Sequence, residues 1–535
     1  MSSAHTILPQ DTCHCYLREM YRAIWWIKRD MRLTDNEALA GGLEWVMSRT
    51  SDSAAELVPA FVVEPASINA PDNSSLHWSL IVDALGSLRQ DLQMRGSELM
   101  VCWGDLPGAF ARLHADMPFQ AMFAEEETGN LHTYRRDEQV RAWCAAQGIH
   151  KEEVPHNGVV RKLRDRDTRM RVWHERMRRP VSAAPHDMFM SHATRALAAK
   201  TELPTVAQLR DAGLREDVSP RGLQRCTEQH ATKMAHSFLY RRSREYTSGI
   251  SSPAEARRSG SRMSVHLAWG TMSLRTLYQM LDARVAELDA AAEREKSRAA
   301  RGRSTGAAGW RRALRAFQSR LFWHDHFCQR LEDEPDMELH PLNRAYEELE
   351  YENDPAALRA WLSGRTGFPL VDASIRALQR TGFLNFRMRA MIVSCACHVL
   401  RLDWRLIRDP MARWMADYLP GIHLSQLQMQ ASVVGINTVR VYSPTKQLLD
   451  HDPECLFVRR FVDELRPHSA DAIRRHAIAT AGSKTARNAI GIDVSQSSSQ
   501  STQDSLRQPG LFDEDSPHSG NTAPEPHVLP DYPRP

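Results

Sequence analysis

Hydrophobic and polar residues alternate in two rhythms over the first 150 residues of this chain. Short apolar runs predict four strands, at residues 23–28, 56–64, 99–103 and 121–124. Apolar positions at helical spacing predict helices over residues 76–95 and 134–147, each followed by a glycine. Thr34-Asp35-Asn36-Glu37 has the form of a capping box and opens a further helix. The alternation predicts an α/β domain with a parallel sheet covered by helices.

Helical spacing dominates residues 222–465, where few segments indicate strands. A chain of 535 residues is too long for one compact core, so the change of pattern predicts a second, all-α domain. The predicted parts are an irregular extension (1–21), the α/β domain (22–150), a basic interdomain linker (151–221), the helical domain (222–470) and a mostly disordered tail (471–535). Within the helical domain, residues 298–309 are rich in Ala, Arg, Gly and Ser and predict a flexible loop.

Composition excludes several classes of protein without indicating a partner. Apolar residues make up 42% of the chain, enough for buried cores, and the net charge is only +3. No Gly-x-Gly-x-x-Gly follows the first strand, so a dinucleotide-binding site of that type is not supported. The nine cysteines form no Cys-x-x-Cys pair, which argues against zinc and iron–sulfur sites. No apolar run is long enough to cross a membrane and no signal peptide is evident, so we expect a cytoplasmic protein. From the cysteine spacing we expect no bound metal.

Several motifs share their order and spacing with one known family. Residues 24–39 read IWWIKRDMRLTDNEAL, residues 366–376 read TGFPLVDASIR and residues 381–389 read TGFLNFRMR. Together with the motifs around them, these segments resemble photolyases and cryptochromes over roughly residues 22–150 and 222–465. The resemblance implies an α/β domain followed by an all-α FAD-binding domain. In the first motif, Arg29, Asp30 and Arg32 are expected to pair with one another and to serve the architecture.

The resemblance also implies where the FAD phosphates are held. Phe238-Leu239 and Arg242 precede a set of positions that match the family's phosphate-binding segment: Tyr246, Gly260, Ser261, Arg262, Met263 and Ser264. Free N–H groups and the positive end of the dipole at a helix start suit a phosphate. Gly260 stands where the family usually has threonine, so one hydroxyl is lost.

A second set of positions matches the family's flavin-ring surroundings. These cofactor-binding candidates are Asn385, Arg387, Arg389, Asp417 and Trp323. Arg389 aligns with the arginine that pairs with an aspartate beside the ring, and Asp417 falls at that aspartate's position with a one-residue gap. DNA phosphates are expected to meet Arg387, Lys446 and Arg320, whereas the basic stretch 161–180 is interpreted as a linker whose charges pair in solvent.

The catalytic candidates are Trp323, Arg320 and Trp404. Trp323 is kept from the family's Glu-x-x-Trp-Arg, but Arg320 replaces the glutamate and, unlike a carboxylate, has no hydrogen-bond acceptor. Trp404 matches one of the three tryptophans that commonly relay electrons to the flavin, and the other two positions hold Tyr351 and Gln428. A rerouted chain through Trp361 and Trp414 is one interpretation, and core packing of these two rings is the other.

Three functions follow from the resemblance. The first is a DNA photolyase that splits pyrimidine dimers in UV-damaged DNA by electron transfer from excited, reduced FAD. The second is a cryptochrome-like blue-light sensor that binds FAD without repair, and the third is a degenerate flavoprotein with neither role. We favour repair by a monomer, with a light-harvesting antenna chromophore of folate or deazaflavin type left open. Glu126 and Glu127 are the candidate contacts for that chromophore.

Overall fold

The computed structural model describes residues 20–49, 54–155, 157–216, 218, 220–299, 306–435, 439 and 441–481. The expected N-terminal extension up to residue 19 and residues 482–535 of the expected tail (471–535) lie outside the described residues. Residues 471–481, also expected to belong to a mostly disordered tail, instead form most of a helix, α22 (Ala470–Ala481). Residues 300–305, the centre of the expected flexible loop, also lie outside them.

The N-terminal domain is built on a five-stranded sheet whose paired strands are all parallel. Its strands are β1 (Tyr21–Ile27), β2 (Ala55–Val63), β3 (Met100–Trp103), β4 (Ala121–Glu125) and β5 (His150–Val154). Their order across the sheet is β3-β2-β1-β4-β5. The sequence pattern predicts the first four strands. It misses β5 because this edge strand reads HKEEV and is only partly buried, so it lacks an apolar run.

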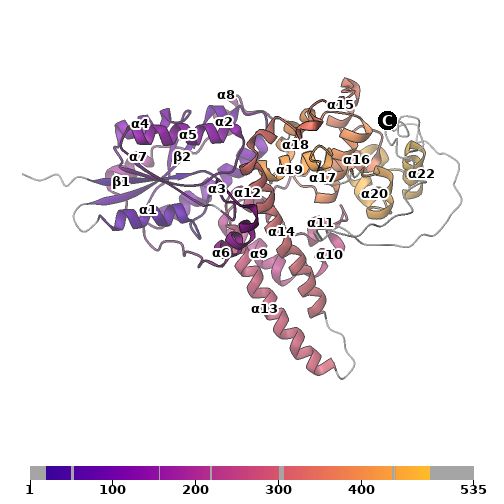
Figure 1. The fold of residues 1–535 in the computed structure, drawn as a ribbon, viewed down its shortest axis with the longest axis horizontal. Coiled ribbons are helices and arrows are strands. Elements are labelled where there is room, and N and C mark those ends of the chain that lie inside the picture. Colours follow the sequence, from indigo (N-terminus) through magenta and orange to yellow (C-terminus); the bar gives the residue numbers. More distant parts are fainter. Residues whose placement is uncertain are drawn as a thin grey trace, which may run out of the picture.

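Helices cover both faces of the sheet (Figure 1). They are α1 (Glu37–Met47), α2 (Pro65–Ile68), α3 (Ser75–Gln93), α4 (Gly108–Asp116) and α5 (Leu131–Ala146). Trp25 on β1 packs in one core with α1 and α3, whereas Trp26 packs in another core with α4 and α5. Successive side chains of a strand point to opposite faces, so β1 is buried on both. Asn36, rather than Thr34, caps α1 by accepting a hydrogen bond from the Leu39 N–H.

The rest of the described chain is mostly helical, as predicted for residues 222–465. Along the sequence, β5 is followed by three helices: α6 (Arg169–Arg178), α7 (His192–Ala198) and α8 (Val206–Asp211). The helical part contains α9 (Glu228–Tyr240), α10 (Tyr246–Gly249), α11 (Ala256–Ser259), α12 (Ser264–Ala268), α13 (Leu274–Ala299), α14 (Ala307–Asp333), α15 (Pro355–Leu362), α16 (Pro369–Thr381), α17 (Phe386–Ser394), α18 (Trp404–Trp414), α19 (Pro420–Gln430), α20 (Pro444–His451), α21 (Leu456–Phe461) and α22 (Ala470–Ala481). The long helices α13 and α14 form a hairpin that projects from the body of the molecule (Figure 1).

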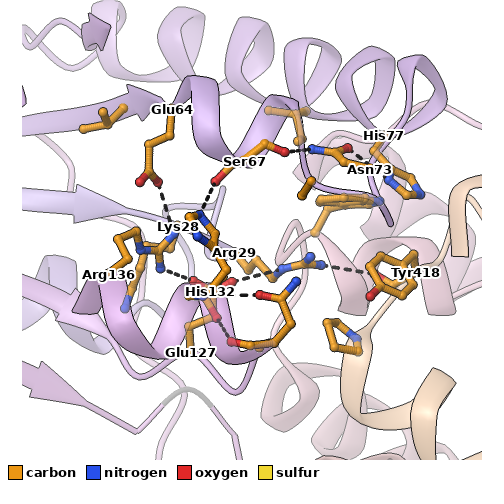
Figure 2. Close-up of a pocket in the computed structure, with 18 of the residues that line it drawn as sticks. Lys28, Arg29, Glu64, Ser67, Asn73, His77, Glu127, His132, Arg136 and Tyr418 are labelled. Atoms are coloured by element: carbon orange, nitrogen blue, oxygen red, sulfur yellow. Dashed lines mark hydrogen bonds and ion pairs between the residues drawn. The ribbon is translucent and has the colours of Figure 1, made fainter. Parts of the chain in front are cut away.

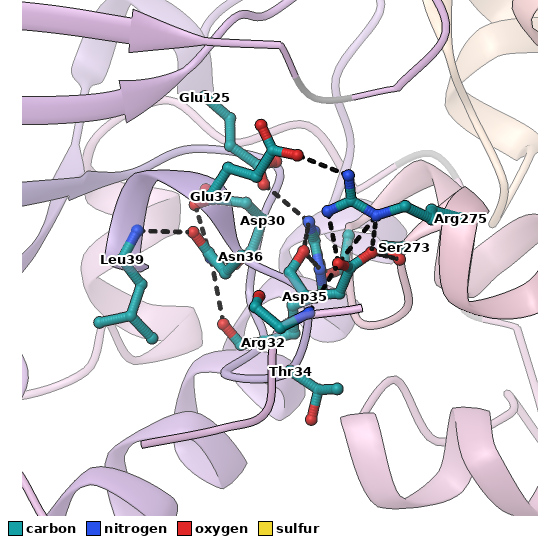
Figure 3. Close-up of polar contacts among 12 residues, drawn as sticks. Asp30, Arg32, Thr34, Asp35, Asn36, Glu37, Leu39, Glu125, Ser273 and Arg275 are labelled. Atoms are coloured by element: carbon teal, nitrogen blue, oxygen red, sulfur yellow. Dashed lines mark hydrogen bonds and ion pairs between the residues drawn. The ribbon is translucent and has the colours of Figure 1, made fainter. Parts of the chain in front are cut away.

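Buried charges join the two parts at the turn after β1 (Figure 3). Asp35 accepts hydrogen bonds from Arg275 Nε at 2.9 Å and from the Ser273 hydroxyl at 2.5 Å, both from the start of α13. Arg32 bonds Glu125 at 2.7 Å and the Gly270 carbonyl at 3.1 Å. The turn therefore connects the sheet to the helical part through side chains that are distant in sequence.

The expectation that Arg29, Asp30 and Arg32 pair with one another is wrong. Arg29 donates to the carbonyls of Ala268 and Tyr418, both at 3.1 Å. Asp30 is fully buried and accepts hydrogen bonds from within its own turn, including the Trp25 indole at 2.9 Å and the Lys28 N–H at 2.8 Å. An arginine fork has five donors, and here backbone carbonyls of the other domain satisfy them better than a neighbouring aspartate does.

Candidate functional site

The segment expected to hold phosphates is a tight turn between α11 and α12. Arg242 holds this turn by donating hydrogen bonds to the carbonyls of Gly260 and, at 3.1 Å, Ser261. A Cβ atom at Gly260 would lie 2.6 Å from the Ala256 carbonyl oxygen. This backbone path therefore explains why glycine stands where the family has threonine. Met263 is buried beneath the turn, and Ser264 is exposed at the first residue of α12.

Positive charge concentrates at the same turn. Arg262 has a left-handed backbone, with φ of 60°. Burial, followed by the charges of Arg257 and Arg242, lowers the pKa of the Arg262 guanidinium to about 10. A cation is destabilised in this way when other cations surround it, and a bound phosphate would relieve that repulsion. The turn is therefore suited to a diphosphate.

A cavity lies between α17, α18 and α19 and encloses about 500 Å³. Arg389 on α17 and Asp417 in the loop before α19 line it. Arg389 Nη2 donates to both Asp417 oxygens, at 2.9 and 3.0 Å, while Arg389 Nε donates to the Leu384 carbonyl at 2.7 Å. The structure thus brings together the arginine and the aspartate that the sequence motif predicts as a pair. Most other residues lining this cavity are apolar.

Two buried acceptors near these features have no hydrogen-bond partner within the described chain. They are Asn385 Oδ1, at the start of α17, and Gln426 Oε1, which belongs to the lining of the Arg389–Asp417 cavity. A buried acceptor left without a donor costs about 1–3 kcal/mol. The sequence analysis missed Gln426, and its only signal is its place one helical turn before Gln430, which lines the same cavity.

Helix α17 connects the segment after α10 with the cavity. At its start, Asn385 Nδ2 donates to the carbonyls of Ile250 and Ser251, which follow α10, at 3.0 and 3.2 Å. One turn further along, Arg389 lines the cavity. The positive turn and the two unpartnered acceptors match a ligand that carries a diphosphate and N–H donors. FAD, the cofactor implied by the resemblance, has these groups, so the residues fit it.

The catalytic candidates do not gather in that cavity. Arg320 on α14 hydrogen-bonds the Tyr246 hydroxyl, and burial raises the pKa of this phenol while Arg320 opposes the shift. Trp323 is half-buried and contacts His326, with ring centroids 5.0 Å apart, and Phe327, at 5.7 Å. Neither Arg320 nor Trp323 lines the Arg389–Asp417 cavity.

Trp404 lies in the core beneath these helices and is fully buried. Trp361 and Trp414 stack in the same core with ring centroids 5.6 Å apart. Gln428, at a position where the family has tryptophan, donates to the carbonyls of Met337 and His340, both at 2.8 Å. These bonds give Gln428 a structural role. They do not decide whether Trp361 and Trp414 serve packing or electron transfer.

A second cavity lies at the carboxyl ends of β1, β2 and β4 and encloses about 870 Å³ (Figure 2). Ligands commonly bind at this edge of a parallel α/β sheet. Glu127 lies in its wall and pairs with Arg29 at 3.3 Å and with Arg136 at 2.6 Å. Glu126, the other candidate contact, does not line this cavity.

The chain segment 417–420 separates the two cavities. Asp417 and Leu419 line the cavity between α17 and α19, whereas Tyr418 and Pro420 line the one at the sheet edge. Successive side chains thus point to opposite sides of one segment. A group bound at the sheet edge would lie across a single layer of protein from a group beside Arg389.

Glu64, in the wall of the sheet-edge cavity, makes stability depend on pH. Burial raises the pKa of Glu64 to about 7, even though Arg136 lies 3.2 Å away. The folded state therefore holds the proton more tightly than the unfolded state does. The resulting stability is full below about pH 4.5 and is lost as pH rises to about 7, a change of about 3 kcal/mol.

We expect Glu64→Gln to remove this pH dependence, because glutamine keeps the neutral form at every pH. Thermal unfolding below about pH 5 and above about pH 7 measures it. Wild-type protein and the exposed control Glu44→Gln should lose stability over this range more steeply than Glu64→Gln. Equal slopes in all three proteins would contradict the prediction.

Within the described residues, no helix is long and apolar enough to cross a membrane. Over the same part of the chain, no group of three or more His, Cys, Asp and Glu side chains is placed to hold a metal ion.

Both domains are similar in sequence to known proteins. Residues 23–173 match the sequence model of DNA photolyase, and residues 317–501 match that of the FAD binding domain of DNA photolyase. The deoxyribodipyrimidine photo-lyase of Halobacterium salinarum is 28% identical over 470 residues, which cover 84% of this chain and 91% of the relative. A cryptochrome DASH of Oryza sativa is 21% identical over 488 residues, covering 83% and 77%.

Solved structures share the fold. The photolyase of Sulfolobus tokodaii with two FAD molecules aligns with a TM-score of 0.66 at 24% identity, over 86% of this chain and 94% of that one. The cryptochrome of a Synechocystis species aligns with a TM-score of 0.70 at 19% identity, over 89% and 95%. The two matched sequence models together span more than half of the chain, one on each domain. The chain belongs to the photolyase/cryptochrome family.

Proposed function

We propose that this chain is a light-dependent FAD enzyme that splits pyrimidine dimers in UV-damaged DNA. The observation that carries the proposal is the Arg389–Asp417 pair, which lines a cavity one helical turn from the buried Asn385. These residues stand in the motifs that resemble the family's flavin-binding core. Relatives that cover more than four fifths of the chain are named deoxyribodipyrimidine photo-lyase.

Several of the candidate residues would contact the cofactor or the dimer. Arg262, with Arg257 and Arg242 beside it, would hold the FAD diphosphate. Asn385 and Gln426 would accept hydrogen bonds from N–H groups of the cofactor. FAD, when bound, supplies the electron that splits the dimer. The dimer must leave the stacked duplex to reach the flavin, and Trp323 offers a half-buried ring on which it can stack.

A repair assay tests the function. Protein purified in the dark is expected to show a flavin absorption spectrum and, once its FAD is reduced, to remove dimers from DNA under blue light. Failure on both single- and double-stranded dimer substrates would reject repair and leave the light-sensor function. One observation favours that alternative: Arg320 replaces a carboxylate and bonds Tyr246, so it offers the dimer no acceptor.

Gln426→Leu tests the cofactor site without relying on repair. Leucine removes the unpartnered buried acceptor, so FAD-free protein should be at least as stable as wild type. The affinity for FAD should fall about tenfold, because one hydrogen bond of about 1.5 kcal/mol is lost. Titration of FAD-free protein with FAD, followed by flavin fluorescence, measures this. Unchanged affinity would show that Gln426 does not face the cofactor.

The cavity at the sheet edge is our candidate site for an antenna chromophore. Support comes from its position at the carboxyl ends of the strands and from the single segment that separates it from Asp417. The chromophore would be a planar aromatic molecule of folate or deazaflavin type. Acid extraction of purified protein, followed by chromatography, would identify it. We further propose a cytoplasmic monomer, which size-exclusion chromatography and cell fractionation test.

A further inference from the structure

A groove with four arginines in its walls lies apart from the cavities described above. It encloses about 1200 Å³ between α14, the segment that leads into α6 and the loop before residue 345. The arginines are Arg166, Arg169, Arg330 and Arg344. Two carboxylates, Asp333 and Glu334, also line the groove, so its walls carry an excess of positive charge. None of the proposed FAD-binding residues lines it.

Arg169 is the innermost of these cations and is only 7% exposed. Its guanidinium lies over the Phe322 ring, 4.5 Å from the centroid, and Arg169 Nη1 contacts His326 Nδ1 at 3.2 Å. Nε and Nη2 of Arg169 are buried and have no partner within the described chain. These two donors form the side of the guanidinium that grips a carboxylate or phosphate with parallel hydrogen bonds. A buried cation with two unpaired N–H donors lowers the stability of the fold, and a bound oxyanion would accept hydrogen bonds from both donors.

Around Arg169, the carboxylates of Asp325 and Asp333 favour its charge, and further cations line the groove. Burial, followed by Arg169 and Arg330, lowers the pKa of His326 to about 4, so the ring is neutral and can accept from Arg169. Burial and then Arg166 lower the pKa of Arg330. Arg166 reaches Asp333 and Glu334 only at 3.7 Å and is 75% exposed, so these pairs neutralise it weakly.

The aromatic residue assigned to the lesion lies on the helix face that lines the groove. Trp323, His326 and Arg330 are spaced by three and four residues and share one face of α14. The Trp323 and His326 rings touch, with centroids 5.0 Å apart. An aromatic platform followed by a row of arginines is the arrangement that binds single-stranded nucleic acid, with bases stacked and phosphates paired.

We propose that this groove binds phosphates of the DNA strand that flanks the lesion, with Arg169 gripping one phosphate and with Arg166, Arg330 and Arg344 along its path. The proposal rests on the proposed function, since Trp323 marks the position of the lesion. It also gives the basic stretch 161–180, which contains α6, a role beyond that of a linker.

Salt-dependent DNA binding in the dark tests the groove. Arg330→Gln and Arg166→Gln are compared with Arg171→Gln, a control in the same basic segment whose side chain is 73% exposed, pairs with Glu175 and does not line the groove. Each groove variant should bind a dimer-containing single strand about tenfold more weakly and lower the slope of log K against log salt by about 0.7. The control should match wild type.

Arg169→Lys tests the buried fork, because it keeps the charge and removes the paired donors. A melting temperature and flavin spectrum like those of wild type would show that the variant folds. Folded Arg169→Lys should also bind the strand about tenfold more weakly. If Arg169→Lys does not fold, Arg330→Gln and Arg166→Gln alone decide the proposal.

Repair by the wild-type protein tests the proposed function, and DNA binding by the variants tests the groove separately. Wild-type protein that repairs dimers, together with groove variants that bind like Arg171→Gln, would overturn the groove and leave the function standing. Wild-type protein that repairs nothing would reject the function, and the same slopes measured on undamaged single strands would still test the groove. Inorganic phosphate that stabilises wild type but not Arg330→Gln, with DNA slopes unchanged, would assign the groove to a free anion and overturn the DNA assignment.

Discussion

Replacing Asp417 by asparagine is expected to strip FAD from the protein. Both Asp417 carboxylate oxygens accept from the single nitrogen Arg389 Nη2, and the Asp417 side chain is only 9% exposed. Without the carboxylate, the Arg389 guanidinium remains as an uncompensated charge in a mostly apolar cavity. Removing one partner of a buried pair costs about 3 kcal/mol. We expect this cost to fall on the FAD-bound state, in which the cofactor excludes water from the cavity, so the affinity for FAD should drop roughly a hundredfold.

The ratio of flavin to protein absorbance after purification measures this effect. Asp463→Asn is the matched control, because Asp463 also pairs with arginines but at the surface, where its side chain is 55% exposed. Surface pairs contribute little, so the control should keep its FAD. Asp417→Asn protein with a full complement of FAD would show that the Arg389–Asp417 pair does not serve the cofactor.

Gly270→Ala is expected to have the largest effect on stability. Gly270 follows α12 with a φ of +69°, and a Cβ atom there would overlap the backbone carbonyl of Arg29 in the turn after β1. Backbone cannot move aside as a flexible side chain can, so the domain junction must open. We expect a loss above about 3 kcal/mol, the sum of overpacking and left-handed strain.

Gly148→Ala separates the steric clash from the strain of the left-handed backbone. Gly148 has nearly the same φ, +68°, but nothing lies within 4 Å of an added Cβ. This control should lose only the backbone strain of about 1 kcal/mol. Thermal unfolding followed by circular dichroism compares both variants with wild type. Equal melting temperatures for the two variants would contradict the clash at the junction.

The sequence by itself determined most of the local structure. Strands β1 to β4 and helices α3 and α5 follow from apolar spacing, because burial on one or both faces leaves a periodic record in neighbouring residues. The Arg389–Asp417 pair was also accessible from sequence, since both residues stand in motifs with a familiar order. Edge strand β5 was not, because a partly buried strand needs no apolar run.

Only the tertiary structure decided the partners of polar side chains that meet across the chain. Arg320 bonds Tyr246, and Arg32 reaches Gly270 rather than Asp30. The unpartnered acceptor of Gln426 and the unpartnered donors of Arg169 are visible only once burial and all neighbours are known. Hydrogen bonding is short-ranged and directional, so these partners depend on how distant segments pack and leave no periodic signal in the sequence.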